Sequence, residues 1–286
     1  MNSIMHLLIA SIFCSVAVSI FLKLARRHHI DVGQAIVVNY LTAVSLCVVL
    51  LRPDPMSVME SGTPLWLLIL LGFLLPTIFI AMARAVEHAG IVLADAAQRL
   101  SLVIPLLAAA LIFGESIGGT KLIGVSLAIL ALICLTVKSS SSDNSSHGKQ
   151  ATLFLLAVWL GFGVIDILFK QLSKGGAQFA GSLVITFVVA GLVMLSFLIA
   201  RRTQWSAHSL LSGIGLGLLN FGNIFYYIKA HQHFPENPTL VFSAMNIGVI
   251  TAGTLVGAGF FKEKLSKVNM LGIGLAISAI MALIPR

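Results

Sequence analysis

The sequence predicts an all-α polytopic membrane protein, with ten transmembrane helices arranged as two inverted five-helix repeats. Of its 286 residues, 58% are hydrophobic and only 10% are charged, whereas about 25% of the residues are charged in a soluble domain. A spanning helix needs about 20 apolar residues, and the chain contains ten such runs. A polar, Ser-rich linker at 138–150 divides these runs into two sets of five.

The first five spans form the segment 1–137. No basic residue precedes the first span, which leads straight into further spans, so we expect a retained helix and not a cleaved signal peptide. Pro76 and Pro105 each remove a backbone donor inside a span, which predicts kinks in the third and fourth helices. The expected spans are 4–25, 32–51, 64–86, 90–113 and 119–137.

The second five spans form the segment 151–286. They are expected at 151–172, 177–200, 206–230, 237–261 and 267–284. Pairs of small residues four positions apart predict close helix packing in three of the ten spans. These pairs are Gly124 with Ala128, Gly253 with Gly257, and Gly272 with Ala276. The middle pair has a second interpretation, in which both glycines face a substrate cavity.

A shift of 147 to 148 residues superimposes landmarks of the first half on the second, which predicts an internal repeat. Glu115 and Glu263 then stand at equivalent positions before the fifth and tenth spans, where we expect each carboxylate to cap the helix that follows it. Because five is an odd number of spans, the second repeat must enter the membrane from the opposite side. Inverted pairs are typical of secondary transporters, whose substrate site lies near the membrane midplane between the repeats.

The net charge of +8 does not predict a nucleic-acid partner, because the basic residues stand singly or in pairs between apolar runs. The expected partners are a small-molecule substrate and the lipid bilayer, with the protein a monomer or homodimer in the inner (plasma) membrane. The basic residues are more numerous on the side opposite the termini, which favours termini outside the cell. No cofactor or metal is expected, since the His pairs lack a Cys or acidic cluster that would complete a metal site.

The fourth span carries Asp95, Gln98 and Arg99 on one face. Charged side chains near the bilayer centre are costly and rarely occur there without a partner or an aqueous cavity. Arg99 lies about 15 Å into the span at 1.5 Å per residue, close to the midplane. Its planar fork is expected to hold a carboxylate or phosphate of the substrate, with Asp95 orienting the fork. In the alternative interpretation, the two charges form an ion pair that only fixes this helix to its neighbours.

The sixth span places Asp166 one turn before Lys170, with Trp159 on the same side. Because Lys170 can extend to the membrane interface, Asp166 is the first candidate for a titrating group in proton coupling. The alternative is a permanent bond between Asp166 and Lys170. Trp159 is expected to line the substrate site.

Amide and phenol groups of the eighth and ninth spans complete the expected binding site. Asn220, Asn223 and Tyr227 follow one face of the eighth span. There they either line a cavity and bind a polar solute or bond to neighbouring helices. Asn246 in the ninth span is the repeat mate of Gln98, so we expect both near the centre of the molecule.

Short motifs in both halves resemble those of one family of membrane proteins. In the second half they are Asn237-Pro238, Val241-Phe242-Ser243-Ala244-Met245-Asn246-Ile247-Gly248, Phe261-Lys262-Glu263-Lys264-Leu265-Ser266-Lys267 and Asn269-Met270-Leu271-Gly272-Ile273. The looser equivalents in the first half are Pro105, Gly114-Glu115 and Lys121-Leu122-Ile123-Gly124. Through these motifs the whole chain resembles the drug/metabolite transporter superfamily, in its ten-helix form with two EamA-type domains.

The resemblance implies an inner-membrane permease or exporter of small organic solutes, without ATP-binding domains and with a central cavity between the halves. It also implies cytoplasmic termini, in conflict with the distribution of basic residues. The chain departs from many relatives in the second span, where Asn39-Tyr40 stands in place of an Arg.

The leading functional hypothesis is a gradient-driven, optionally proton-coupled transporter or exporter of a small organic metabolite or amino-acid-like solute, working by alternating access. The chain has no G-x-x-x-x-G-K-[ST] loop for ATP. An enzyme is not expected, because no Glu-x-x-His, His-x-Glu or Gly-x-Ser-x-Gly constellation is present. The alternatives are a flippase for a lipid-linked sugar, with a phosphate near Arg99, and, further removed, an intramembrane enzyme.

Overall fold

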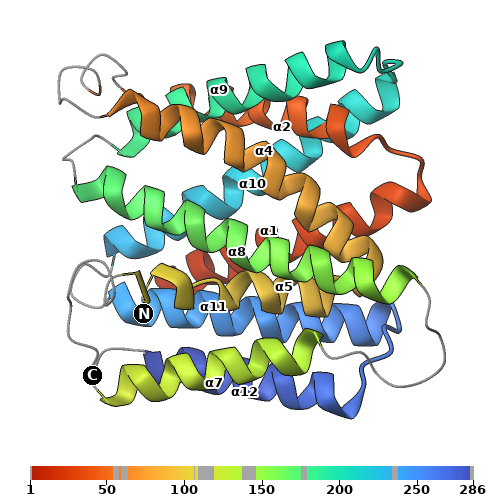
Figure 1. The fold of residues 1–286 in the computed structure, drawn as a ribbon. Coiled ribbons are helices and arrows are strands. Elements are labelled where there is room, and N and C mark those ends of the chain that lie inside the picture. The colour runs from red at the N-terminus through yellow and green to blue at the C-terminus, as the bar shows by residue number, and fades with distance from the viewer. Residues whose placement is uncertain are drawn as a thin grey trace. The chain divides into compact units, whose positions relative to one another are not determined.

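The computed structural model describes residues 2–53, 58, 64–105, 107–108, 119–136, 146–174, 179–233 and 238–283. Every regular element in these ranges is a helix, which confirms the predicted all-α class (Figure 1). The elements are α1 (Asn2–Arg27), α2 (Val32–Leu46), η1 (Cys47–Leu51), α4 (Leu65–Ala89), α5 (Ile91–Leu100), α7 (Gly119–Thr136), α8 (Ser146–Lys174), α9 (Phe179–Ala200), α10 (Ala207–His233), α11 (Pro238–Thr254), η2 (Leu255–Phe260) and α12 (Lys267–Leu283). The segments η1 and η2 are π-helical continuations of α2 and α11.

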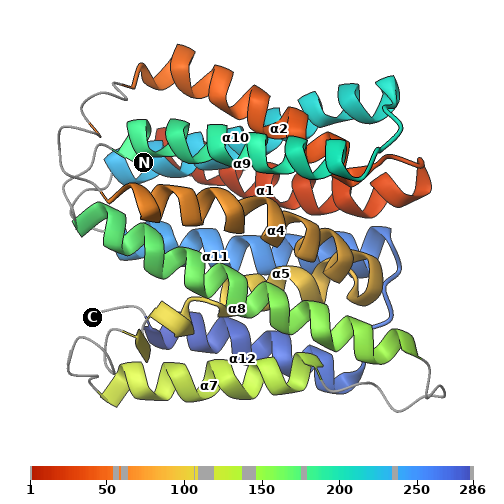
Figure 2. The ribbon, with the colours of Figure 1, turned by 45° about the horizontal axis from the view of Figure 1, so that its top comes forward.

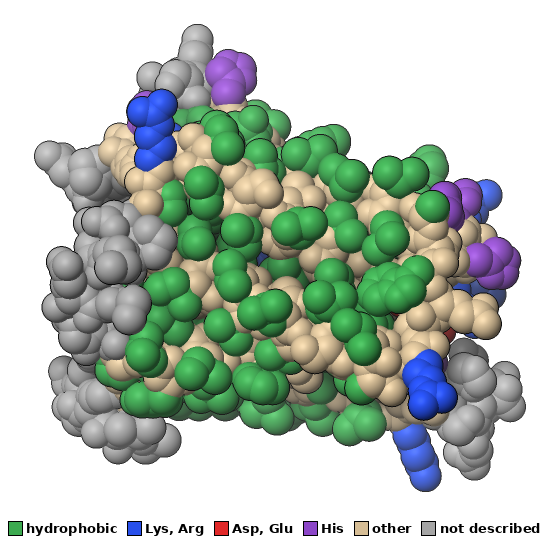
Figure 3. Space-filling view, turned by 90° about the horizontal axis from the view of Figure 1, so that it is seen from above, with side chains coloured by type: hydrophobic (Ala, Val, Ile, Leu, Met, Phe, Trp, Pro, Cys, Tyr) green, Lys and Arg blue, Asp and Glu red, His purple; other side chains and the backbone are tan. Residues whose placement is uncertain are grey.

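The helices have the length and surface of membrane spans. Six helices in the described part of the chain are long and apolar enough to cross a bilayer, and Leu122–Leu135, Ala244–Phe260 and Lys267–Leu283 are shorter apolar helices. Large hydrophobic side chains such as Phe13 and Leu192 are exposed. On the face drawn in Figure 3, hydrophobic side chains predominate, and Lys, Arg and His side chains lie near its edges. Because such a surface is suited to lipid and not to water, the protein is a polytopic membrane protein.

The fourth span is interrupted just before Pro105. A proline has no N–H to offer the carbonyl four residues earlier, and its ring clashes with that carbonyl in an α-helix. Here that carbonyl belongs to Ser101, and it accepts a hydrogen bond from the backbone N of Ile104 at 2.9 Å instead. The helix α5 accordingly ends at Leu100. In contrast, α4 remains one continuous helix through Pro76.

The polar linker ends earlier than expected. The helix α8 begins at Ser146, whereas the sixth span was expected to begin at 151. A hydropathy window locates only the apolar part of a helix, and the first residues of α8 are polar. The helix therefore extends beyond the segment that the window identifies.

The chain forms two compact units, each built from segments of both halves of the sequence. Unit 1 contains Met1–Lys23, Ala81–Gly163 and Gly222–Arg286, and unit 2 contains Leu24–Ile80 and Val164–Phe221. The boundaries fall within α1, α4, α8 and α10, so each of these helices contributes residues to both units. The helices α5, α7, α11 and α12 belong to unit 1, and α2 and α9 belong to unit 2.

In unit 1, α7 and α12 lie side by side and run in opposite directions (Figure 1, Figure 2). Gly124, near the start of α7, faces Leu283 at the end of α12, and a Cβ on Gly124 would lie 2.6 Å from Cγ of Leu283. Gly272, near the start of α12, faces Leu135 near the end of α7, and a Cβ on Gly272 would lie 3.1 Å from Cγ of Leu135. The same contact occurs twice with the helices exchanged, as in a twofold-symmetric interface. The close packing predicted for these two glycines is confirmed.

In unit 2, α2 packs against α9 in the same antiparallel way. The rings of Tyr40 and Phe187 lie with their centroids 5.9 Å apart. Gly33, near the start of α2, faces Met194 and Leu198 farther along α9, and its Cβ would lie 3.0 Å from each side chain. The repeat shift makes α2 equivalent to α9, and α7 equivalent to α12. Both pairs are antiparallel, as two repeats of opposite orientation require.

Candidate functional site

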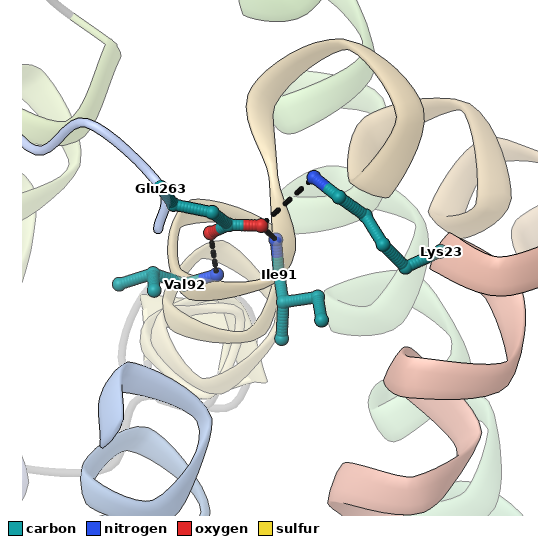
Figure 4. A network of polar contacts seen from close by, with 4 residues as sticks. All are labelled: Lys23, Ile91, Val92 and Glu263. Carbon is teal, nitrogen blue, oxygen red and sulfur yellow. Dashed lines mark hydrogen bonds and ion pairs between the residues drawn. The ribbon is translucent and has the colours of Figure 1, made fainter. Parts of the chain in front are cut away.

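The helix α5 begins at a carboxylate supplied by a distant part of the chain. Gly90, the residue before it, has a φ of 91° and no side chain to cap the helix. Glu263, between η2 and α12, takes this role (Figure 4). Its Oε1 accepts a hydrogen bond from the backbone N of Ile91 at 2.9 Å, and its Oε2 accepts one from Val92 at 3.2 Å. An anion is stabilised there because the first N–H groups of a helix have no partner within it and lie at the positive end of its dipole.

The prediction that Glu263 caps the tenth span is therefore wrong about which helix is capped. Glu263 precedes α12 in the chain but caps α5. The helix α12 is capped by Ser266, whose Oγ accepts a hydrogen bond from the backbone N of Asn269 at 3.0 Å. Glu115, predicted to cap the fifth span, lies outside the described residues.

Glu263 is also joined to α1. The Nζ of Lys23 lies 2.9 Å from its Oε1, and the side chains of Lys23 and Glu263 are 23% and 10% exposed. Two glycines give the carboxylate its space, because a Cβ would lie 2.6 Å from Oε2 if placed on Gly90 and 2.8 Å from it if placed on Gly257. One carboxylate thus connects α1, the start of α5 and η2.

The helix α1 contributes a polar stripe in which a polar residue recurs every four positions. Residues at this spacing share one helix face, and the stripe is about 18 Å long at 1.5 Å per residue. Each member bonds to a partner within unit 1. The pairs are Ser11 with Asn223, Ser15 with Arg99, Ser19 with Asp95, and Lys23 with Glu263. The sequence-based prediction missed this stripe, although the spacing Ser-x-x-x-Ser-x-x-x-Ser-x-x-x-Lys within an apolar run is a signal that identifies it.

Asp95 and Arg99 lie one turn apart on α5, and each bonds to a serine of α1. Asp95 is 2% exposed, and its Oδ1 accepts a hydrogen bond from Oγ of Ser19 at 2.7 Å. Arg99 is half-buried; its Nη2 donates to Oγ of Ser15 at 2.8 Å, and its Nη1 donates to Oδ1 of Asn246 at 3.4 Å. The structure therefore brings together three of the predicted residues, Asp95, Arg99 and Asn246.

The helix α11 runs antiparallel to α5 and presents small residues to it. Residue numbers rise along α11 as they fall along α5. The facing pairs are Asn246 with Arg99, Gly253 with Asp95, and Gly257 with Val92. Of the two interpretations of these glycines, the structure therefore supports packing against a helix, and that helix is the one that carries the charged residues.

Trp159 of α8 contacts the C-terminal end of α5, the end at which Gln98 lies. The Nε1 of Trp159 donates to the carbonyl of Leu100 at 3.0 Å. The backbone carbonyl of Gln98 accepts a hydrogen bond from Oγ of Ser101 at 2.7 Å. Trp159 thus binds the backbone at the end of α5, where the fourth span is interrupted. A role of Trp159 in substrate binding stays a prediction, as does that of the Gln98 side chain.

Comparison with known proteins gives the family. Residues 2–137 match the EamA-like transporter family. The first half of the chain therefore belongs to this family. A protein of Haemophilus influenzae described as uncharacterized is 50% identical over 286 residues, which cover 98% of this chain and 97% of that protein. A crystal structure with 16% sequence identity has the same fold, with a TM-score of 0.59 over 98% of this chain and 96% of that one.

This EamA-like protein is therefore a multi-pass membrane transporter of the drug/metabolite transporter type, with a small-molecule substrate. Its remaining predicted site residues have partners of their own. In unit 1, Oδ1 of Asn223 accepts a hydrogen bond from Ser11 at 2.9 Å, and Tyr227 packs against a cluster that includes Val16 and Met245.

Two predicted residues of the transporter belong to unit 2. The Nδ2 of Asn220 donates to Oδ1 of Asn39 at 3.2 Å, which is the interhelical bond of the alternative interpretation. Asp166 has an exposed side chain on α8, and the side chain of Lys170 lies outside the described residues, so the coupling role of Asp166 stays a prediction. Within the described ranges, no three or more His, Cys, Asp or Glu side chains form a group that could hold a metal ion.

Proposed function

We propose that the protein is a secondary, gradient-driven transporter of a small organic metabolite that carries a carboxylate, such as an amino-acid-like solute, and that Arg99 binds this group. The observation that carries the proposal is the arrangement of Arg99 on α5, whose guanidinium is held at two nitrogens by Ser15 and Asn246. We place the transporter in the inner (plasma) membrane, as a monomer or homodimer.

The partners of Arg99 suit it to bind an anion. Ser15 and Asn246 are neutral, so the hydrogen bonds that they accept orient the guanidinium and bring no opposing charge to it. A charged side chain inside a membrane marks a functional site by default, because it is costly there. A planar guanidinium also matches the geometry of a carboxylate through two parallel N–H···O bonds.

The antiparallel pairing of equivalent helices supports alternating access. Arg99 and Asn246 are 147 positions apart, which is the shift of the predicted repeat. Asn246 is the predicted repeat mate of Gln98, the residue before Arg99, so this hydrogen bond joins nearly equivalent positions of the two predicted repeats, 1–137 and 151–286. In transporters built from inverted repeats, the substrate binds at such a boundary, and rocking of one repeat against the other opens it to each side in turn.

Transport in proteoliposomes tests the proposal, with ¹⁴C-labelled alanine, glutamate and succinate as separate probes. Losing a charge-assisted hydrogen-bonded pair costs about 1.5–3 kcal/mol, so Arg99→Ala should reduce the uptake of a transported probe about 10- to 100-fold. Arg99→Lys, which keeps the charge but not the fork, should retain part of it. Arg84→Ala is the matched control, because Arg84 forms an exposed pair with Glu87 on α4.

Unchanged uptake by Arg99→Ala would contradict the site assignment. A thermal-shift panel of amino acids, organic acids, nucleosides and cationic drugs widens the search for the substrate, because a ligand that binds only the folded state raises its apparent stability. Movement of a fluorescent lipid-linked phosphate, with no movement of soluble probes, would instead support the flippase.

A further inference from the structure

We propose that Asp95 carries the proton that drives transport, and that its protonation strengthens the attraction between the site around Arg99 and the substrate anion. This inference rests on the proposed function, because it takes Arg99 as the anchor of the substrate. It names the coupling ion and its carrier, and it moves the coupling role from Asp166 to Asp95.

The carboxyl group of Asp95 is hydrogen-bonded at one oxygen only. Its Oδ1 accepts from Ser19 at 2.7 Å, whereas Oδ2 is buried and has no hydrogen-bond partner among the described residues. With the side chain 2% exposed, a charged carboxylate is costly unless both oxygens are satisfied. A proton on Oδ2 removes the charge and leaves the hydrogen bond from Ser19 in place.

The surroundings of Oδ2 are better suited to a proton than to a metal cation. Gly253 of α11 faces this oxygen so closely that a Cβ there would lie 2.8 Å from it. A hard cation needs several oxygen ligands around it, and within the described residues Asp95 belongs to no group of three or more His, Cys, Asp and Glu side chains. A proton needs only the one oxygen.

Among the residues that the structure describes, the charged groups near Asp95 are Lys23 on α1, Glu263 before α12, and Arg99 on α5 itself. The helix α11 carries no titratable side chain. Lys23 and Glu263 form an ion pair at 2.9 Å, and Asp95 stands one turn from Arg99, at a spacing where opposite charges attract. With Asp95 ionised, these four groups have no net charge. With Asp95 protonated, their net charge is +1.

The protonated set of charges attracts an anion, and the neutral set does not. Proton and substrate therefore favour each other's binding, and by linkage the effect is reciprocal. In one cycle, a proton binds Oδ2 of Asp95 and an anion binds Arg99 on the side of higher proton potential. Both leave on the other side, and Asp95 returns as a carboxylate. Proton and substrate thus move in the same direction.

The proton on Asp95 can be observed without any substrate. Infrared difference spectra of the purified full-length protein, titrated across the neutral range, should contain a protonated-carboxyl band. This band should disappear in Asp95→Asn and persist in Asp166→Asn and in Glu87→Gln, the control on α4. If Asp95→Asn does not fold, Ser19→Ala should shift the band by removing the bond to Oδ1. A spectrum that neither Asp95→Asn nor Ser19→Ala changes overturns the proposal.

Transport gives a second readout in proteoliposomes, with the same ¹⁴C-labelled alanine, glutamate and succinate. An inward proton gradient should drive the wild type to accumulate a transported probe, and a protonophore should abolish the accumulation. Asp95→Asn resembles the protonated acid, so it should lose this accumulation but retain exchange of the probe at equal concentrations. A residue with only a structural role would lose both. Glu87→Gln should retain both.

The outcomes separate this inference from the proposed function. If Arg99→Ala loses transport while Asp95→Asn still accumulates the probe with the proton gradient, Arg99 stands as the anchor and the inference on Asp95 is overturned. Loss of accumulation in Asp166→Asn alone, or accumulation driven by sodium without protons, also overturns it. If Arg99→Ala transports normally, or if no probe is transported, the infrared band still decides whether Asp95 carries a proton.

Discussion

At the scale of single residues, the polar groups of unit 1 are organised by partners that are far apart in the sequence. Glu263 combines three such interactions, since it caps α5 at two backbone N–H groups and pairs with Lys23 of α1. Gly90 and Gly257 leave the space that its carboxylate occupies. The position of α5, and with it that of Asp95 and Arg99, therefore depends on one side chain outside that helix.

Replacing Glu263 tests this dependence. Glu263→Gln keeps the shape but removes the charge that Lys23 and the helix N-terminus bind, and charged hydrogen bonds contribute about 1.5–3 kcal/mol each. We expect a lower melting temperature of the detergent-purified protein. Glu87→Gln breaks an exposed pair with Arg84, where a loss of only about 0–1 kcal/mol is expected. Equal melting temperatures for the two variants would show that Glu263 does not anchor α5.

At the scale of helices, close approach is set by where glycines stand. On α7, Gly124 lies against Leu283 of α12. A Cβ placed on Gly124 would lie 3.2 Å from the backbone N of Leu283. On α12 itself, Gly274 has no atom within 4 Å of such a Cβ. Two glycines in similar apolar helices therefore have different roles, which the contact surface of each helix decides.

Substituting alanine at these two glycines should have opposite effects. Alanine favours a helix over glycine by about 1 kcal/mol, but overpacking a tight contact costs about 1–3 kcal/mol. Gly124→Ala should therefore lower the melting temperature, and Gly274→Ala should leave it unchanged or raise it. A stabilising effect of Gly124→Ala would contradict the close packing of α7 and α12.

At the scale of the whole molecule, equivalent helices of the two halves pair in antiparallel fashion. Gly124 of α7 contacts Leu283 of α12, and Gly272 of α12 contacts Leu135 of α7, so the same contact occurs twice with the helices exchanged. The pair α2 and α9 and the pair α5 and α11 are antiparallel as well. This pattern is expected when one five-helix unit is duplicated and its copy is inverted in the membrane.

Cysteine cross-linking tests this arrangement in a background without Cys14, Cys47 and Cys134. The pairs Gly124→Cys with Leu283→Cys and Leu135→Cys with Gly272→Cys should both form a cross-link with a short reagent. The pair Gly124→Cys with Gly272→Cys should not, because it joins opposite ends of antiparallel helices. A cross-link in this last pair alone would indicate parallel helices and contradict inverted repeats.

The sequence by itself determined the class of the protein and the extent of nearly all its described helices. Burial in lipid requires a continuous apolar run, and a run is a local property that hydropathy detects. The sequence also placed Asp95 and Arg99 on one face of a span, because helical spacing is local as well. The interruption before Pro105 follows from the chemistry of a single residue.

Only the tertiary structure decided which polar groups meet. A carboxylate next to a helix start predicts a cap, but the N–H groups that reach Glu263 belong to α5, far from it in the chain. The serines of α1 have significance only once Asp95 and Arg99 lie opposite them. In a membrane, a buried polar group must find a partner within the protein, and which partner it finds depends on helices brought together by the fold.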